Sequence, residues 1–316
     1  MPSSEPAPSR DRRAPVLVVG EALVDVVESQ GGDERRAIPG GSAANVALGL
    51  ARLGVAVRLA THLGRDPYGN LVARFLCGEG VEVDDSSFGA DRTSTAVARP
   101  GPDGDVDYEF DVGWLMPAVD LAGAREATHV GSFAAFSTPE PVLTDMLGAA
   151  RGHVLLSCDP NVRPALIADR AAAQARFRRL VRVLDVVKLS DADAEYLFPG
   201  NSPDAVADVL LGAGVGLVVV TRAQDGLLLA DRTDRVRVPA VPATVIDTIG
   251  AGDTVMASVL ADVARGRDLT DLESVGRRAA AAAAITVSRA GADLPRAGEL
   301  AASHGVETFA RAPRDA

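Results

Sequence analysis

The feature that most constrains this chain is a glycine-rich turn at residues 247–254, with the sequence Asp-Thr-Ile-Gly-Ala-Gly-Asp-Thr. It lies between a β-branched run and an alanine-rich segment of helical character. Gly250 and Gly252 carry no Cβ, so the backbone can turn sharply there and approach a ligand closely. A helix expected at residues 255–264 would direct unpaired N–H groups and its positive dipole end at the same place. The turn therefore predicts an anion site.

Asp253, at the start of this helix, has two interpretations. A carboxylate beside an anion site is well placed to accept a proton from a hydroxyl group while a phosphoryl group is held there. Alternatively, Asp253 is a simple N-cap and the glycines only shape a strand-to-helix turn. The turn alone does not decide between these two interpretations.

The composition narrows the class of protein. The chain has 316 residues and a net charge of −11, which argues against a nucleic-acid or anionic-membrane partner. Cys77 and Cys158 show no metal or redox spacing, so we expect a reducing, cytoplasmic location. No apolar run reaches the roughly 18 residues of a membrane-spanning helix. Residues 1–14 are rich in Pro, Ser and Arg, and we interpret them as a disordered tail.

Short apolar strands alternate with helical segments along most of the chain, which predicts an α/β fold with a mostly parallel sheet. Strands are expected at residues 16–19, 55–61, 127–130, 154–157, 186–189, 217–221, 227–230 and 236–238. The first is expected to continue to Asp25. That carboxylate would then lie at the carboxyl edge of the sheet, where ligands gather. A turn aspartate is the alternative interpretation.

Two further segments carry functional signals. Gly40 and Gly41 precede a small-residue helix, and Asn45, one turn inside it, can offer a donor and an acceptor to a polyol. Residues 81–114 interrupt the alternation with β-like pieces around a Pro-Gly-Pro-Asp-Gly turn. This small β excursion is predicted to cover a site and exclude water. A surface hairpin or a dimer contact is the alternative.

The segments 40–45 and 247–253 resemble the two signatures of the ribokinase-like, PfkB-type sugar kinases. The resemblance covers almost the whole chain after the tail, and no Gly-x-x-x-x-Gly-Lys-Ser/Thr motif is present. It implies a three-layer α/β sandwich with a mostly parallel central sheet over residues 15–312. A small β-sheet lid would be inserted from about 26–38 and 90–113.

The resemblance also implies roles for individual residues. Asp253 would be the catalytic base, and the amides of Gly250, Ala251 and Gly252 would form the anion hole. The implied sugar contacts are Asp25, Gly40, Gly41 and Asn45. The implied nucleotide contacts are Thr221, Gly226 and the stretch from Ala284 to Gly291. Asp247 and the carbonyl of Ile249, where the family more often has Thr, would bind a monovalent cation, often K⁺.

One family element departs from the common pattern. Many relatives carry Asn-x-x-Glu near Mg²⁺ and the phosphates, and here the matching residues are Ser190 and Asp193. Aspartate keeps the charge but is one methylene shorter, so we expect Asp193 to act on Mg²⁺ through water. Fructokinase-like members also use Ser at the first position. The resemblance therefore places Ser190 at the ATP site and indicates the fructokinase-like subgroup.

Other segments point to the same subgroup. Residues 20–25, 159–164 and 188–191 resemble fructokinases and 2-keto-3-deoxygluconate kinases. Arg163 could pair with a substrate carboxylate or hydroxyl, or form a structural ion pair. Residues 108–111 of the lid contain no arginine that would favour the keto acid, so D-fructose is the preferred substrate.

The resemblance thus predicts an ATP- and Mg²⁺-dependent sugar kinase that forms a homodimer through the lid. A 2-keto-3-deoxygluconate kinase, a ribokinase and a non-catalytic sugar- or nucleotide-binding relative remain the alternatives.

Overall fold

The computed structural model describes residues 16–28, 35–100, 106–119, 126–139 and 141–302. The predicted tail at 1–14, the end of the predicted domain at 303–312 and the turn at 101–104 lie outside the described residues.

A nine-stranded sheet forms the centre of the described structure, in the order β13-β12-β11-β10-β9-β8-β1-β4-β5. Its strands are β1 (Val16–Val19), β4 (Val57–Ala60), β5 (Glu82–Val83), β8 (Ala127–Gly131), β9 (Leu155–Asp159), β10 (Val186–Ser190), β11 (Leu217–Thr221), β12 (Leu227–Ala230) and β13 (Arg235–Val238). All neighbours pair in parallel except β11 with β12 and β12 with β13. The mostly parallel sheet predicted from the apolar runs is confirmed.

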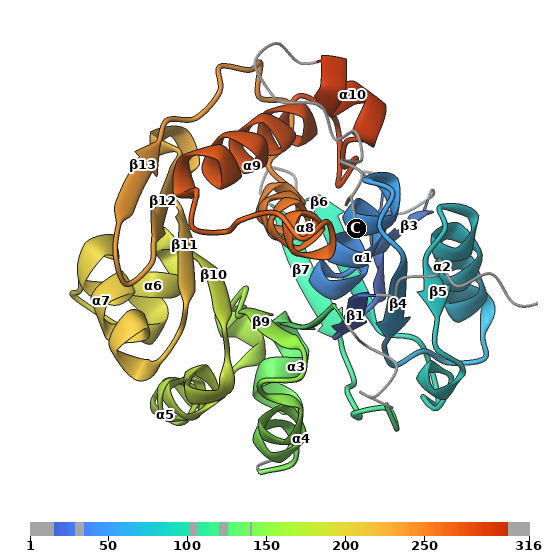
Figure 1. Cartoon of the computed structure of the whole chain (residues 1–316). Helices are drawn as coiled ribbons and strands as arrows, with labels where there is room; N and C mark the ends of the chain where they lie inside the picture. Colours follow the sequence, from blue (N-terminus) through green and yellow to red (C-terminus); the bar gives the residue numbers. More distant parts are fainter. Residues whose placement is uncertain (1–15, 29–34, 101–105, 120–125, 140, 303–316) are drawn as a thin grey trace, which may run out of the picture.

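Helices cover both faces of this sheet (Figure 1). One face carries α1 (Ser42–Arg52), α2 (Pro67–Gly78), α8 (Ala251–Ala264) and α9 (Leu272–Val287). The other carries α3 (Ser132–Ser137), α4 (Val142–Ala150), α5 (Arg170–Leu180), α6 (Asp191–Leu197) and α7 (Pro203–Ala213). The last described helix is α10 (Ala297–Ala302), and short 3₁₀ turns lie at Asp85–Ser87, Pro164–Leu166, Val181–Val183 and Ala223–Asp225.

Strand β1 shows why the sheet strands are apolar throughout. Val16 and Val18 belong to the core that contains α1 and α8, whereas Leu17 and Val19 belong to the core on the opposite face. Since successive side chains point to opposite faces, a strand covered by helices on both sides must be apolar at every position. The three-layer sandwich follows from this pattern.

A separate four-stranded sheet has the order β3-β2-β6-β7. Its strands are β2 (Leu23–Glu28), β3 (Arg35–Gly40), β6 (Thr95–Pro100) and β7 (Val106–Asp111). Val24 and Val26 on one face are buried in the core that includes α2. Asp25, on the other face, lies opposite Ile38 and Ala96.

The prediction that the first strand continues to Asp25 is wrong. β1 ends at Val19, and Asp25 belongs to β2 of the small sheet. An apolar run does not reveal where a chain leaves one sheet and joins another, because both strands are rich in buried apolar side chains: all of them in β1 and every second one in β2. Asp25 therefore does not lie at the carboxyl edge of the central sheet.

Candidate active site

The glycine-rich turn forms the N-terminus of α8. Gly250 is its N-cap, with φ of +78°, and α8 begins at Ala251, four residues before the predicted start. A Cβ at Gly250 would lie 2.9 Å from the Cβ of Ala292, so a close packing contact also requires glycine. Among the described residues, the amides of Gly252 and Asp253 donate to no protein acceptor. These are the donors that an anion site needs.

Asp253 is buried in the first turn of α8, with only 6% of its surface exposed. The Ser42 hydroxyl donates to its Oδ1 at 2.7 Å, and Asn45 Nδ2 donates to its Oδ2 at 2.8 Å. Because Gly250 occupies the N-cap position, the interpretation of Asp253 as a simple N-cap is wrong. Two side chains of α1 instead hold both carboxylate oxygens beside the free amides.

The electrostatic surroundings of Asp253 act in both directions. Burial and the charge of Asp159 raise the pKa of Asp253 above its ordinary value. Hydrogen bonds from Asn45 and Ser42 and the charge of Lys188 oppose this increase. A carboxylate with a raised pKa is a stronger proton acceptor once ionised, which suits a general base.

Glu21 fixes the start of α1. Its Oε1 accepts from the Ser42 amide and its Oε2 from the Phe133 amide, each at 3.1 Å. Burial raises the pKa of Glu21 to about 7. A Cβ at Gly41, where φ is +104°, would lie 2.6 Å from the Glu21 carbonyl oxygen. Gly41 therefore lets the helix start close to the Glu21 backbone, which sets the position of Ser42.

Asp25, Gly40 and Arg163 also come together. A Cβ at Gly40 would lie 2.2 Å from Oδ2 of Asp25, so glycine is needed for this carboxylate to occupy its place. Burial raises the pKa of Asp25 to about 6, and the charge of Arg163 partly offsets this increase. The Arg163 guanidinium donates to Oδ1 of Asn161 at 2.6 Å.

Ser190 and Asp193 form a capping box at the start of α6. Asp193 Oδ2 accepts from the Ser190 amide at 2.9 Å and hydroxyl at 2.7 Å, and its Oδ1 accepts from the Val162 amide at 2.7 Å. Ser190 pairs in the sheet with Thr221, so both lie at the carboxyl ends of neighbouring strands. The arrangement gives Asp193 a structural role, and its action on Mg²⁺ stays a prediction.

A cavity of about 800 Å³ lies between the segment after β13 and helix α9. It is lined by residues 237–244 and by Glu273, Arg277, Ala280, Ala281, Ala284, Ile285 and Ser288. Gly226 supports one wall, because a Cβ there would lie 2.1 Å from the Val238 carbonyl oxygen. The volume falls in the range of small-molecule sites.

Asp247 connects the glycine-rich turn to the segment after α9. Its Oδ1 accepts from the Ile249 amide at 3.0 Å and its Oδ2 from the Gly291 amide at 2.8 Å. Each oxygen keeps a lone pair for a cation. Within the described ranges, no three His, Cys, Asp or Glu side chains gather to hold a metal ion.

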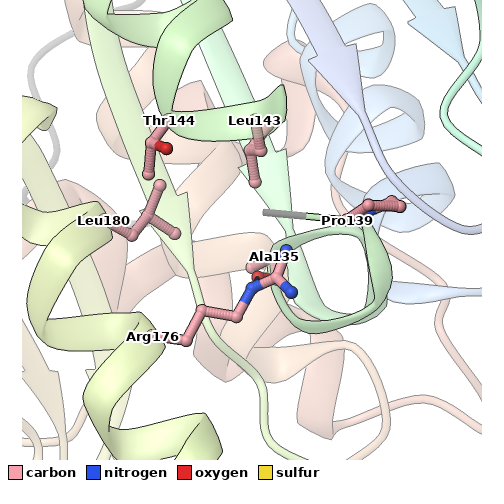
Figure 2. A pocket seen from close by; sticks show the side chains of 6 residues that line it. All are labelled: Ala135, Pro139, Leu143, Thr144, Arg176 and Leu180. Carbon is pink, nitrogen blue, oxygen red and sulfur yellow. Dashed lines mark hydrogen bonds between the residues drawn. The ribbon is translucent and has the colours of Figure 1, made fainter. Parts of the chain in front are cut away.

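A small crevice between α3, α4 and α5 lies apart from these residues. Figure 2 shows the side chains that line it, among them Arg176, Leu143 and Leu180. Arg176 donates to the Ala135 carbonyl oxygen at 2.6 Å and closes one side. The crevice is too small to hold a water molecule, and none of the predicted site residues lines it.

Comparison with known proteins decides the family. Residues 13–297 match the model of the pfkB family carbohydrate kinases. The chain belongs to this family. It is therefore a carbohydrate kinase, an enzyme that transfers a phosphoryl group, as the resemblance in the sequence predicted.

Similar proteins include fructokinases. The fructokinase of Salmonella typhimurium is 33% identical over 302 residues, covering 88% of this chain and 95% of the relative. A double mutant of the fructokinase from Vibrio cholerae O395, solved with fructose, ADP and potassium ion, has a TM-score of 0.77 at 25% identity. The alignment covers 92% of this chain and 97% of that one.

A more distant structure supports the fold alone. An Escherichia coli protein described as a ribokinase II, in complex with ATP and Mg²⁺, has a TM-score of 0.75 at 22% identity. The alignment covers 89% of this chain and 94% of the Escherichia coli chain. The ribokinase-like fold expected from the sequence is confirmed. None of the helices in the described part of the chain is long and apolar enough to span a membrane.

Three residues near the site carried signals that we did not interpret from the sequence. Ser42 directly follows the glycine pair, at a helix start where a hydroxyl can contact a ligand or a neighbour. Glu21 is an acid directly after a buried strand. Lys188 is the charged residue in an otherwise apolar strand core. A charge in a fully buried strand is unusual and is the signal that could have identified the last of these.

Proposed function

We propose that this carbohydrate kinase transfers the γ-phosphoryl group of ATP to the primary hydroxyl of a ketose, D-fructose in the first instance. The observation that carries the proposal is the placement of Asp253. Its two oxygens are held by Ser42 and Asn45 next to the unpaired amides of Gly252 and Asp253 itself. A proton acceptor and an anion site thus share one small space.

The reaction follows from this arrangement. The sugar oxygen attacks the γ-phosphorus and forms a new O–P bond, and Asp253 takes the hydroxyl proton. The bond between the γ-phosphorus and the bridging oxygen breaks, and ADP leaves with that electron pair. The amides of Gly250 and Gly252 would stabilise negative charge on the transferring group. The Ala251 amide, the third predicted donor, is engaged with the Thr248 carbonyl oxygen at 3.3 Å and would have to leave it to take part.

Nucleotide and cations are assigned to neighbouring parts of the site. The cavity beside Ala284 would take the adenine moiety, with Thr221 and Gly226 on the phosphate side. Mg²⁺ would neutralise charge on the phosphates, with Asp193 acting through water. Asp247 and the Ile249 carbonyl would bind K⁺, and Gly291 keeps the Asp247 carboxylate in place.

The sugar would lie between Asp253 and the small sheet. Asp25 from β2, the backbone at Gly40 and Gly41, and the side chain of Asn45 would contact its hydroxyl groups. The positive charge of Arg163, which acts on Asp25, also favours a second candidate, 2-keto-3-deoxygluconate, because a guanidinium group can bind a carboxylate in a bidentate manner. The small sheet would act as a lid that excludes water during transfer.

The experiment is a sugar panel with ATP and Mg²⁺, with and without K⁺, run on the wild type and Asp253→Asn. We expect fructose to give the highest kcat/KM. The Asp253→Asn variant should lose roughly 10²-fold or more in kcat with little change in sugar affinity, because a positioned base is removed. A near-normal kcat in this variant refutes the role of Asp253. No ATP turnover with any sugar would instead favour a binding protein.

A further inference from the structure

A lysine lies buried in the central sheet directly beneath the glycine-rich turn. Lys188 is in the middle of β10 and is 3% exposed. Its neighbours Val187 and Leu189 point into the core on the far side of the sheet, whereas Val186 shares the core of α8. Because side chains alternate along a strand, Lys188 points to the α8 side.

Two contacts define where its ammonium group lies. Lys188 Nζ donates to Asp159 Oδ2 at 2.8 Å, and Asp159 Oδ1 accepts from the Asn161 amide at 3.2 Å. A Cβ at Gly252 would lie 2.6 Å from Nζ of Lys188. The ammonium group therefore occupies the space that a side chain at position 252 would need. It lies against the turn at Gly252 and is shielded from solvent.

Stability alone does not explain this pair. Taking two charges out of water costs several kcal/mol each, and a well-packed apolar pair of similar size is often as stable. The site also sets a cation beside the positive end of the α8 dipole, which is unfavourable in the absence of an anion. Asp159 offsets part of both costs, and a negatively charged group held in the turn would offset more of them.

Three carboxylates face Lys188 and already offset part of these costs. They are Asp159 on β9, Asp193 on α6 and Asp253 on α8. The His129 ring on β8 also lies near Lys188. Burial alone would lower the pKa of Lys188, but the charges of Asp159 and Asp193 raise it. The side chain thus stays protonated. Burial and the nearby Lys188 lower the pKa of His129 to about 3, so this ring stays neutral.

We propose that Lys188 is a positioning residue of the phosphoryl-transfer site, where its ammonium group supports the turn at Gly252 and places a fixed positive charge behind it. The inference rests on the proposed function and adds a residue to it. Lys188 acts through the turn and through Asp253 rather than by touching the sugar.

The test is Lys188→Met, which keeps an unbranched side chain one atom shorter and removes the charge. We expect kcat to fall by about 10- to 100-fold, by analogy with removal of one donor from an anion hole. The acid limb of the kcat–pH profile should shift to higher pH, because Asp253 loses a nearby positive charge. Affinity for a non-hydrolysable ATP analogue relative to ADP, measured by calorimetry, should fall about tenfold, since only the analogue carries the third phosphate.

Arg278→Met is the matched control. Arg278 on α9 forms a buried pair with Asp262, also at 2.8 Å, near the other end of α8. This variant should lower the melting temperature and leave kcat, the pH profile and nucleotide selectivity unchanged. If Lys188→Met does not fold because Asp159 is left unpaired, Lys188→Met with Asp159→Asn removes both charges. The same losses of kcat and of nucleotide selectivity are then expected of the folded double variant. Its pH profile is not a criterion, because Asp159 and Lys188 shift the pKa of Asp253 in opposite directions.

The outcomes separate the two proposals. The inference is overturned if the folded variant keeps kcat within about twofold, an unshifted pH profile and normal nucleotide selectivity. If the wild type phosphorylates no sugar, the proposed function fails, but a loss of ATP-analogue selectivity in Lys188→Met still supports the placement of the charge. Absence of any nucleotide binding by the wild type contradicts both.

Discussion

At the scale of single residues, the site is a group of carboxylates kept from water. Burial raises the pKa of Asp253, of Glu21 to about 7 and of Asp25 to about 6. Each has a different set of partners: hydroxyl and amide side chains for Asp253, backbone amides for Glu21, and the charge of Arg163 for Asp25. Perturbed acids gathered in one place are typical of catalytic sites.

Glu21 gives a prediction about stability and pH. Its pKa in the folded protein, about 7, exceeds the ordinary value of 4.5. Between these values the folded state binds more protons than the unfolded state. The stability contributed by this group is therefore fully present below pH 4.5 and lost as the pH rises through about 7.

We expect Glu21→Gln to remove the loss of stability that Glu21 causes as the pH rises. The difference in unfolding free energy between variant and wild type should move in favour of the variant by more than about 1 kcal/mol over that pH window. Urea unfolding at several pH values measures it. Glutamine leaves one backbone amide unpaired. This lowers the unfolding free energy of the variant by the same amount at every pH, so it does not change the slope of that free energy against pH. Parallel curves for the two proteins would contradict the assigned pKa.

At the scale of elements, glycines decide how closely the segments around the site approach. Gly226, predicted as a nucleotide contact, has φ of +79° and lies against the chain at residues 238–240. It joins β11 to β12 and holds the antiparallel hairpin against the wall of the large cavity. A structural reason for glycine is therefore present whether or not a nucleotide contacts it.

Gly226→Ala should destabilise the protein by about 1–3 kcal/mol, because the new Cβ strains a left-handed residue and collides with the Val238 carbonyl. Thermal or urea unfolding measures this. Gly212→Ala in α7 is the control, since nothing lies within 4 Å of its added Cβ. There we expect a gain of about 0.5–1 kcal/mol from the helix interior. Equal stability of the two variants would contradict the packing argument.

At the scale of the whole molecule, the small sheet has one face in the core and one that is partly open. Val27 and Ile38 on the open face are 42% and 36% exposed and lie on the same side as Asp25. A sheet with an exposed apolar face and free edges favours pairing with a second copy. The homodimer through the lid, expected from the family resemblance, is proposed on this basis.

Val27→Glu should convert the dimer to a monomer, because a charge would be buried against the partner sheet. Light scattering after size-exclusion chromatography measures the mass. Val209→Glu on α7, a valine with a similar exposed fraction of 47%, should leave the mass unchanged. A monomeric wild type, or dimers in both variants, would refute the proposed lid interface.

The sequence by itself determined the fold class and the family. Buried strands such as Leu217–Thr221 are apolar at every position, and the glycine-rich turn before α8 is a continuous motif. Both signals are local, because strand period and glycine conformation depend on a few adjacent residues. The general alternation of strands and helices could therefore be predicted, whereas α3, α7 and the break between β1 and β2 were not.

The tertiary structure alone decided which side chains meet. Ser42 and Asp253 are separated by 211 positions in the chain and share a hydrogen bond of 2.7 Å. Lys188 reaches Gly252 from a strand whose sequence shows only an isolated charge. No pattern of neighbouring residues encodes such contacts, since they arise when strands and helices distant in sequence pack against one another. The support around Asp253, the proposed general base, is thus a property of the packed fold.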